Sequence, residues 1–216
     1  MEFADIARSA VTTRYFSDQP VPDEMLVRAL DYARYAPNGG NRQPAHFVIV
    51  RDPRHRKALA DLYLQPWKAY YNAAQDGDVA IGATNAARAL ANADHMAEHL
   101  HEVPVIVVAC AELAGLHPTD TELGRLSIVG GGSIYPAVQN FILGCREQGL
   151  GAALTTLLCI FEPQVKELLG IPEGFVTAAH IPVGYRTKAF PTRLDRKPLS
   201  EMVHNGTWGT PLPAAG

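Results

Sequence analysis

The sequence has few cysteines, no hydrophobic run of membrane length and no excess of positive charge. Its three cysteines lie in apolar segments without CxxC spacing, which predicts buried, reduced thiols. No apolar run reaches the roughly 18 residues that span a bilayer, and the acidic, amphipathic start is not typical of a secretory or transit peptide. A formal net charge of −3 favours neither nucleic acid nor a membrane surface as a partner. We therefore expect a cytoplasmic protein.

Several sequence motifs of catalysis are also missing. No GxSxG is present to form a nucleophile elbow, and no GxGxxG opens a helix after a strand. The apolar segments contain no paired carboxylates, which argues against the simplest acid/base hydrolases. The remaining polar features are of a kind that binds ligands rather than one that reacts with them.

One metal motif is present, because the segment from His95 to His99 reads HMAEH and matches the HxxEH signature of a zinc peptidase class. Histidines four residues apart share a helix face and could hold a metal. The segment is flanked by Asp94 and Glu102, however, and the class needs a distant glutamate that the sequence does not identify. We interpret it as a solvated helix face and predict no metal, keeping a zinc peptidase acting through His95, Glu98 and His99 as a remote alternative.

The chain is otherwise typical of one globular domain, with 216 residues of which 47% are hydrophobic. Its central stretch predicts a helix that is apolar nearly all round, with Ser133 as the N-cap and Pro136 in the first turn. Gly149 suits a left-handed end of this helix. The apolar run 151–157 predicts a buried strand directly after it.

Periodicity and turn residues predict the other elements. We expect further helices over 2–9, from 23 to before Pro37, over 53–64 with an end at Pro66, over 85–101 and over 163–169, and strands over 47–50, 103–110 and 175–185. Pro182 favours an edge or a bulge for the last strand. Residues 67–84 give no clear signal, and the polar segment 112–126 is a candidate mobile lid. The last thirty residues have no periodicity, which indicates a tail that needs another surface, such as a second subunit.

The features suited to binding are spread along the chain. Arg14 stands alone in a β-branched and aromatic segment, and the APNGGNRQPAHF loop over 36–47 is rich in amides and free backbone N–H groups. Thr155 and Thr156 end the strand that follows the central helix, and arginines lie in the tail. Cationic side chains suit a phosphate, and free N–H groups suit the acceptor atoms of a heteroaromatic ring.

Taken in order, the Arg-x-Phe segment, PVPDE, APNGGNRQP, GSIYPAVQN, GLGAALTT and the closing GY…RKPL resemble the FMN-dependent nitroreductase family over most of the chain. The resemblance implies an α+β fold with a mixed or antiparallel sheet of four or five strands flanked by helices. It also implies an intertwined homodimer with FMN at the interface. Residues 1–216 would form a single domain, with about 186–216 as an arm that wraps the partner subunit.

The resemblance also implies which residues bind the cofactor. Thr12 and Arg14 resemble the segment that binds the phosphate and ribityl chain, and the amide-rich loop resembles the one that lines the flavin from the other subunit. The full set implied is Thr12, Arg14, Pro37, Asn38, Gly39, Asn41, Gln43, Thr155, Thr156, Leu157, Arg193 and Arg196. In this set Thr155–Leu157 face the flavin edge and Arg196 is the phosphate arginine, assisted by Arg193. The family has arginine where this chain has Ala10 or Val11, so that Arg8 is a candidate replacement.

The function implied is an FMN-dependent oxidoreductase that passes electrons from NADPH or NADH to a small acceptor, such as a nitroaromatic or a quinone, by a ping-pong mechanism. The flavin carries the redox chemistry, so no side chain is named as catalytic. Two alternatives remain open. One is a flavin-binding protein without turnover, which the missing arginines suggest. The other is a divergent reaction of the family, namely reductive dehalogenation or flavin fragmentation.

Overall fold

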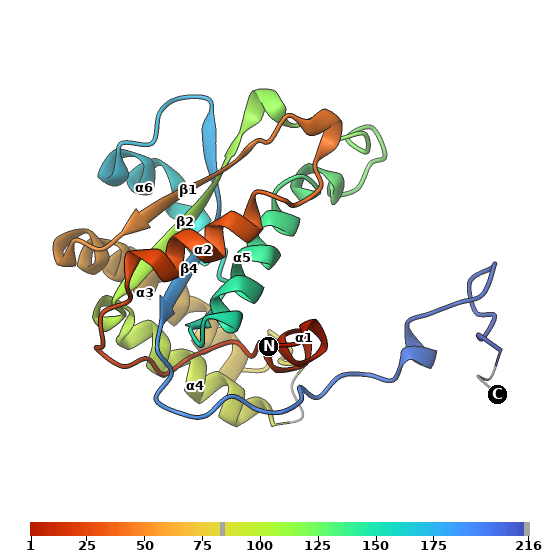
Figure 1. Ribbon diagram of the computed structural model, residues 1–216, viewed down its shortest axis with the longest axis horizontal. Helices are drawn as coiled ribbons and strands as arrows, with labels where there is room; N and C mark the ends of the chain where they lie inside the picture. Colours follow the sequence, from red (N-terminus) through yellow and green to blue (C-terminus); the bar gives the residue numbers. More distant parts are fainter. Residues whose placement is uncertain (83–84, 214–216) are drawn as a thin grey trace.

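The computed structural model describes residues 1–82 and 85–213, and it shows a sheet with helices on both faces (Figure 1). The sheet has four antiparallel strands in the order β1-β2-β4-β3. The strands are β1 (Ala45–Val50), β2 (Val105–Glu112), β3 (Gly151–Ala152) and β4 (Phe175–Gly184). The expectation of an α+β fold with an antiparallel sheet between helices is confirmed.

One face of the sheet packs against α2 (Asp23–Ala33) and α5 (Tyr135–Glu147). Alternate residues of β2, beginning with Val105 and Val107, point to this side, as the two-residue period of a strand requires. The two helices approach closely at Gly144, because a Cβ there would lie 2.8 Å from the Ala29 backbone. Helix α1 (Phe3–Ser9) packs against α5.

The opposite face carries α3 (Pro53–Gln75), α4 (Ala86–Glu98) and α6 (Glu162–Leu169). The other alternate residues of β2, among them Ile106 and Val108, point into this second core. Short 3₁₀ turns lie at Gly39–Asn41, Leu100–Glu102, Leu113–Gly115, Val129–Gly131, Leu157–Phe161 and Leu199–Glu201. No helix among the described residues has the length and apolar character needed to cross a membrane.

Helix α5 differs from the prediction at its start and on its outer face. Its N-cap is Ile134 and not Ser133, whose Oγ instead accepts a hydrogen bond from the Gly39 N–H at 3.1 Å. The outer face exposes Tyr135 and Gln139, so the helix is not buried all round within one chain. Its left-handed end at Gly149 is as predicted, with a φ of 78°.

The predicted end of a helix at Pro66 is wrong, because α3 continues through this proline to Gln75. A proline inside a helix removes one backbone hydrogen bond, a cost that tertiary packing can offset. Here the next turn begins with Trp67, which is 6% exposed and lies parallel to Tyr63, with ring centroids 6.3 Å apart. Burial of these two aromatic side chains favours continuation of the helix.

The strand predicted over 151–157 is shorter, and the strand that contains Pro182 is not at an edge. β4 pairs with β2, with a shift in register where Ala109 and Cys110 pair with Ala179 and Thr177, and with β3 on its other side. The Pro182 carbonyl accepts a hydrogen bond from the Ala153 N–H at 3.2 Å. In an antiparallel pair the N–H and C=O of one residue point to the same neighbouring strand, so the second hydrogen bond to this segment is missing because proline has no N–H. The ladder therefore stops after Ala152, and Thr155 pairs with His180 only through an isolated bridge.

Two irregular segments complete the fold. Residue Asp120 is buried in the segment predicted as a lid, and its carboxylate accepts from Arg125, Ser127 and the Ile128 N–H, at 2.6 to 3.0 Å. These hydrogen bonds lower the pKa of Asp120 to about 2.

The tail after β4 passes below α1 in the view of Figure 1 and then extends away from the rest of the chain.

We predict that His180 makes the fold sensitive to acid. Its side chain is 1% exposed, neither ring nitrogen has a described partner, and burial lowers its pKa from 6.5 to about 4. Between pH 6.5 and about pH 4 the folded protein therefore binds fewer protons than the unfolded chain. The free energy of unfolding does not depend on His180 above the unfolded pKa, and it decreases as the pH falls from there through the folded pKa. The expected loss is about 3 kcal/mol.

Chemical denaturation of His180→Leu at several pH values measures this contribution. The variant should lose that part of the pH dependence without losing stability at neutral pH, since an unsatisfied polar group is removed. The exposed His117→Gln serves as the control and should keep the wild-type dependence. An unchanged pH profile in His180→Leu would contradict the prediction.

Candidate functional site

One cavity brings together the isolated arginine of the N-terminal segment and the end of the strand after α5. It has a volume of about 370 Å³ and lies between α3, α4 and the segment after β3. Its lining consists of Arg14, Tyr63, Trp67, Tyr70, Ile81, Ala89, Leu90, Ala93, Leu154, Thr155, Thr156 and Leu157. Four of the twelve sequence-predicted cofactor residues therefore line the same space, although they are more than 140 residues apart in the chain.

Backbone pairing places Arg14 at this cavity. The Thr13 N–H donates to the Ala152 carbonyl at 2.9 Å, and Thr12 forms a parallel bridge with Ala152. A Cβ at Gly151 would collide with the Thr13 side chain, so the approach requires glycine. Arg186 also donates to the Thr13 Oγ1, at 3.0 Å. Thr12 itself is exposed and does not line the cavity.

Arg14 is an uncompensated cation. Its guanidinium contacts the Met96 sulfur at 3.3 Å, and within the described residues it forms no ion pair with a carboxylate. Burial lowers the pKa of Arg14. A half-buried charge without a partner destabilises a fold unless a ligand compensates it, so this residue indicates an anionic or electron-rich ligand.

Three aromatic residues of α3 form the wall of the cavity, and the sequence analysis did not assign them. Burial raises the pKa of the Tyr63 phenol, and the neighbouring Thr155 side chain and the charge of Arg14 act in the opposite direction. The Trp67 indole N–H donates to Asp94 at 2.7 Å, and the Tyr70 ring lies 5.6 Å from that of Trp67. The helical spacing of the three aromatic residues could have predicted a shared face. The predicted helix ended at Pro66, however, so Trp67 and Tyr70 lay outside the predicted helix.

The amide-rich loop lines a second, separate cavity of about 180 Å³. Asn38 and Gln43 reach it, and the Asn38 Oδ1 accepts from the Gln43 N–H at 2.9 Å. Asn41 and Gln43 both have a φ of 52°, a left-handed conformation that is unusual for residues other than glycine. Pro37, Gly39 and Asn41 are exposed on the same loop and do not line the cavity.

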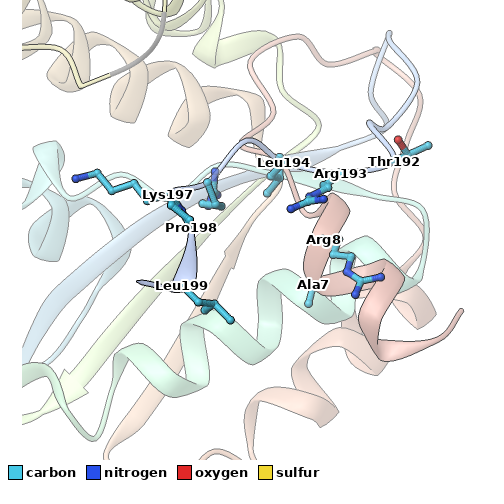
Figure 2. A pocket seen from close by; sticks show the side chains of 9 residues that line it. Ala7, Arg8, Thr192, Arg193, Leu194, Lys197, Pro198 and Leu199 are labelled. Carbon is cyan, nitrogen blue, oxygen red and sulfur yellow. The ribbon is translucent and has the colours of Figure 1, made fainter. Parts of the chain in front are cut away.

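The tail arginines lie at a third place. A hollow of about 820 Å³ is lined by Ala7, Arg8, Thr192, Arg193, Leu194, Arg196, Lys197, Pro198 and Leu199. Figure 2 shows Arg8 on α1 and Arg193 on the tail beside it, whereas Lys197 points away from α1. The tail is held here because the Leu194 N–H donates to the Arg8 carbonyl at 2.8 Å. The structure thus adds Arg8 to the cations that could bind a phosphate, as the missing arginines at Ala10 and Val11 suggested.

The histidines of the HxxEH motif do not assemble a metal site. The rings of His95 and His99 lie 4.3 Å apart, His95 also stacks on Tyr15, and the Glu98 carboxylate accepts from Lys68 at 2.8 Å. Among the described residues no group of three histidines, cysteines or acids is arranged to hold a metal ion. The geometry gives no support to the zinc peptidase alternative.

The donor set fits a flavin mononucleotide. Arg14 and Thr155–Leu157 line an aromatic-walled cavity suited to a flat heteroaromatic ring, and Arg8, Arg193 and Arg196 are cations suited to a phosphate. Within one chain, however, the predicted residues are distributed over three separate places. The described chain alone therefore presents parts of such a site and not its entire lining.

Comparison with known proteins agrees with these features. The sequence model of the Nitroreductase family matches residues 7–185. A 5,6-dimethylbenzimidazole synthase of Rhodospirillum rubrum is 30% identical over 82% of this chain and 79% of its own length. A provisionally named NADH dehydrogenase/NAD(P)H nitroreductase of Archaeoglobus fulgidus is 26% identical over 80% of this chain and 78% of its own. The crystal structure of oxidised iodotyrosine deiodinase bound to FMN and 3-iodo-L-tyrosine superposes with a TM-score of 0.72 at 22% identity, covering 96% of this chain and all of the other.

The chain belongs to the nitroreductase family, which supports an oxidoreductase and confirms the resemblance seen in the sequence. Its relatives carry names for different reactions, so the family alone does not define the reaction of this chain.

We predict that Arg14 costs stability in the flavin-free protein. Arg14→Met should leave its free energy of unfolding unchanged or raise it, because an uncompensated buried charge is removed. Arg56→Met is the matched control, since this half-buried guanidinium donates to the His101 and Val103 carbonyls at 2.8 and 2.6 Å. Denaturant unfolding should show a loss of roughly 2 kcal/mol or more for Arg56→Met. A comparable loss in Arg14→Met would show that Arg14 has a structural role.

Proposed function

We propose that the protein is an FMN-dependent oxidoreductase that passes electrons from NADPH or NADH to a small acceptor by a ping-pong mechanism. The observation that carries this proposal is the half-buried Arg14, which has no carboxylate partner among the described residues and lies in the same cavity as Thr155–Leu157. When bound, FMN supplies the two-electron chemistry. The chain supplies a cation, backbone donors and an apolar wall that limits access of water.

The role proposed for Arg14 is to bind the electron-rich side of the flavin ring, where its charge favours the more negative, reduced state. The backbone at Thr155–Leu157 would hold the other edge of the ring. Arg193 and Arg196 would bind the phosphate with Arg8, and Thr12 would contact the ribityl chain. No side chain is proposed as catalytic, since none of these groups needs to exchange a proton with the acceptor.

We also propose a homodimer in which the site is completed by the second copy. The loop that contains Pro37, Asn38, Gly39, Asn41 and Gln43 is separate from the Arg14 cavity within one chain, and a partner could bring its own loop to that cavity. The tail supports this arrangement because its apolar side chains have no cover in one chain: Leu199, Met202 and Trp208 are 69%, 65% and 91% exposed. Residues from about 186 onward would form an arm on the partner subunit.

Two related functions compete with this proposal. The structural similarity to iodotyrosine deiodinase favours a reductive dehalogenation, and the similarity to a 5,6-dimethylbenzimidazole synthase favours a divergent reaction of the family. A flavin-binding protein without turnover is the third possibility, motivated by Ala10 and Val11.

The three cysteines are free thiols in the structure, which fits the proposed cytoplasmic location.

The absorption spectrum of the purified protein tests the function. We expect a flavin spectrum with about one FMN per chain, bleached by NADPH or NADH without oxygen and restored by a quinone or a nitroaromatic. A flavin that neither nucleotide bleaches would support the carrier instead. Restoration by an aryl iodide, with release of iodide and with no response to quinones, would support dehalogenation. A protein that binds no FMN would refute the proposal.

The dimer is tested by sedimentation. We expect a dimer at micromolar concentration, because burial of the exposed apolar side chains on the tail and of Tyr135 on α5 stabilises association. Trp208→Ser should raise the dissociation constant, by roughly tenfold or more for an aromatic anchor. The matched control is Leu123→Ser, which removes an apolar side chain that is 62% exposed outside the tail. A folded monomer at micromolar concentration would contradict the proposal.

A further inference from the structure

The dipeptide Asn–Gly occurs twice in the chain, at Asn38–Gly39 and at Asn205–Gly206. Asparagine is a thermolabile residue, and a following glycine has no side chain to hinder attack of its backbone nitrogen on the asparagine carboxamide. The first pair belongs to the amide-rich loop. The second lies in the part of the tail that extends away from the rest of the chain (Figure 1). Their surroundings therefore decide which pair can react.

Hydrogen bonds restrain every reacting group of the first pair. The Asn38 Oδ1 accepts from the Gln43 N–H at 2.9 Å, and the Asn38 Nδ2 donates to the Ala36 carbonyl at 3.3 Å. The Gly39 N–H, whose nitrogen would attack, donates to the Ser133 Oγ at 3.1 Å. The carboxamide cannot turn toward the Gly39 nitrogen until these bonds break, and each broken bond adds to the barrier.

The second pair has no such restraint. Asn205 and Gly206 are exposed, and neither the Asn205 carboxamide nor the Gly206 N–H has a hydrogen-bond partner among the described residues. The turn is closed by other backbone groups, since the Asn205 N–H donates to the Thr210 carbonyl at 2.8 Å and the Thr207 N–H donates to the Asn205 carbonyl at 2.9 Å. The carboxamide and the attacking nitrogen are therefore both free and accessible to water.

We propose that Asn205 is a site of spontaneous deamidation, and that Ser133 and the Gln43 N–H protect Asn38 from the same reaction. The Gly206 nitrogen loses its proton and attacks the Asn205 Cγ, the Cγ–Nδ2 bond breaks, and ammonia leaves with that proton. The product is a cyclic succinimide. Water then opens either of its ring C–N bonds and gives aspartate or isoaspartate. Water is the only co-reactant, and no electron is transferred.

The reaction changes both the charge and the backbone of the tail. Each conversion replaces a neutral carboxamide with a carboxylate, three residues from the exposed Trp208. The isoaspartate product also adds a carbon atom to the main chain, which disrupts the pairing of Asn205 with Thr207 and Thr210. On a tail that covers a partner subunit, as proposed above, this change would weaken the contact. The conversion itself depends on neither FMN nor the dimer, so it is tested independently of both.

Peptide mass spectrometry of the purified full-length protein, incubated at mildly alkaline pH, tests the proposal. Water enriched in oxygen-18 labels the carboxylates that form during the incubation. Asn205 should convert at least about tenfold faster than Asn38, because the hydrogen bonds of Asn38 must open first. Asn72, which is exposed on α3 and is followed by alanine, is the control and should remain unlabelled. No conversion at Asn205, or equal rates at the two Asn–Gly pairs, would overturn the proposal.

The same incubation in denaturant separates the effect of the fold from that of the sequence. The two rates should approach each other there, because the restraining hydrogen bonds are lost while both dipeptides remain Asn–Gly. A difference that persists in denaturant would assign the protection of Asn38 to its neighbours in sequence and would overturn the role of Ser133. Asn205→Gln should abolish the labelled tail product, and label that remains in the tail of this variant would refute Asn205 as the site.

Two variants test the protection by Ser133. Ser133→Ala should raise the conversion rate at Asn38 by about threefold or more, because the Gly39 N–H loses its acceptor. Ser133→Thr keeps a hydroxyl acceptor and should restore the rate to within about twofold of the parent. The rate at Asn205 is the internal control and should be the same in both variants. An unchanged rate at Asn38 in Ser133→Ala would show that the hydroxyl does not protect the loop.

Discussion

The candidate site depends on a small set of hydrogen bonds where three segments meet. The Thr13 N–H binds the Ala152 carbonyl at 2.9 Å, and Arg186 binds the Thr13 hydroxyl at 3.0 Å. These contacts join the segment after α1, the short strand β3 and the start of the tail, which are distant in sequence. They place Arg14 on the inner side, toward the cavity, and direct the tail outward. Loss of this junction would separate the cation from Thr155–Leu157 without breaking either element.

The side chains around Arg14 form two layers, and no ion pair among the described residues joins the two. The inner layer has a single cation and neutral side chains, so it can interact strongly with an electron-rich ligand. The outer layer pairs one ammonium group, Lys68, with the two carboxylates of Asp94 and Glu98, and it touches the inner one through the Trp67 N–H. The outer layer therefore holds the Trp67 indole in the wall, while Arg14 is the charged side chain that lines the cavity.

Local patterns in the sequence were sufficient to indicate most of the helices and strands, because periodicity, prolines and glycines act over a few residues. The type of sheet came from the ordered motifs that resemble the nitroreductase family, and the family is confirmed. The miss at Pro66 arose because a proline signals a helix end locally, whereas burial of Trp67 against Tyr63 favours continuation. Ser133 was read as an N-cap, but its hydroxyl binds the distant Gly39. The aromatic wall and the hydrogen bond between Trp67 and Asp94 follow from contacts between α3 and α4, which no single segment encodes.

Strand β1 stands at one edge of the sheet, where unpaired backbone groups can recruit a strand from another molecule. Prolines border it at Pro44 and Pro53, so neither end can lengthen into a longer pairing edge. Arg51 follows it directly and is paired with Asp23 at 2.6 Å, which places charge at that end. A strand this short and bounded is a poor template for cross-chain sheet growth, so the proposed dimer would form through the helices and the tail.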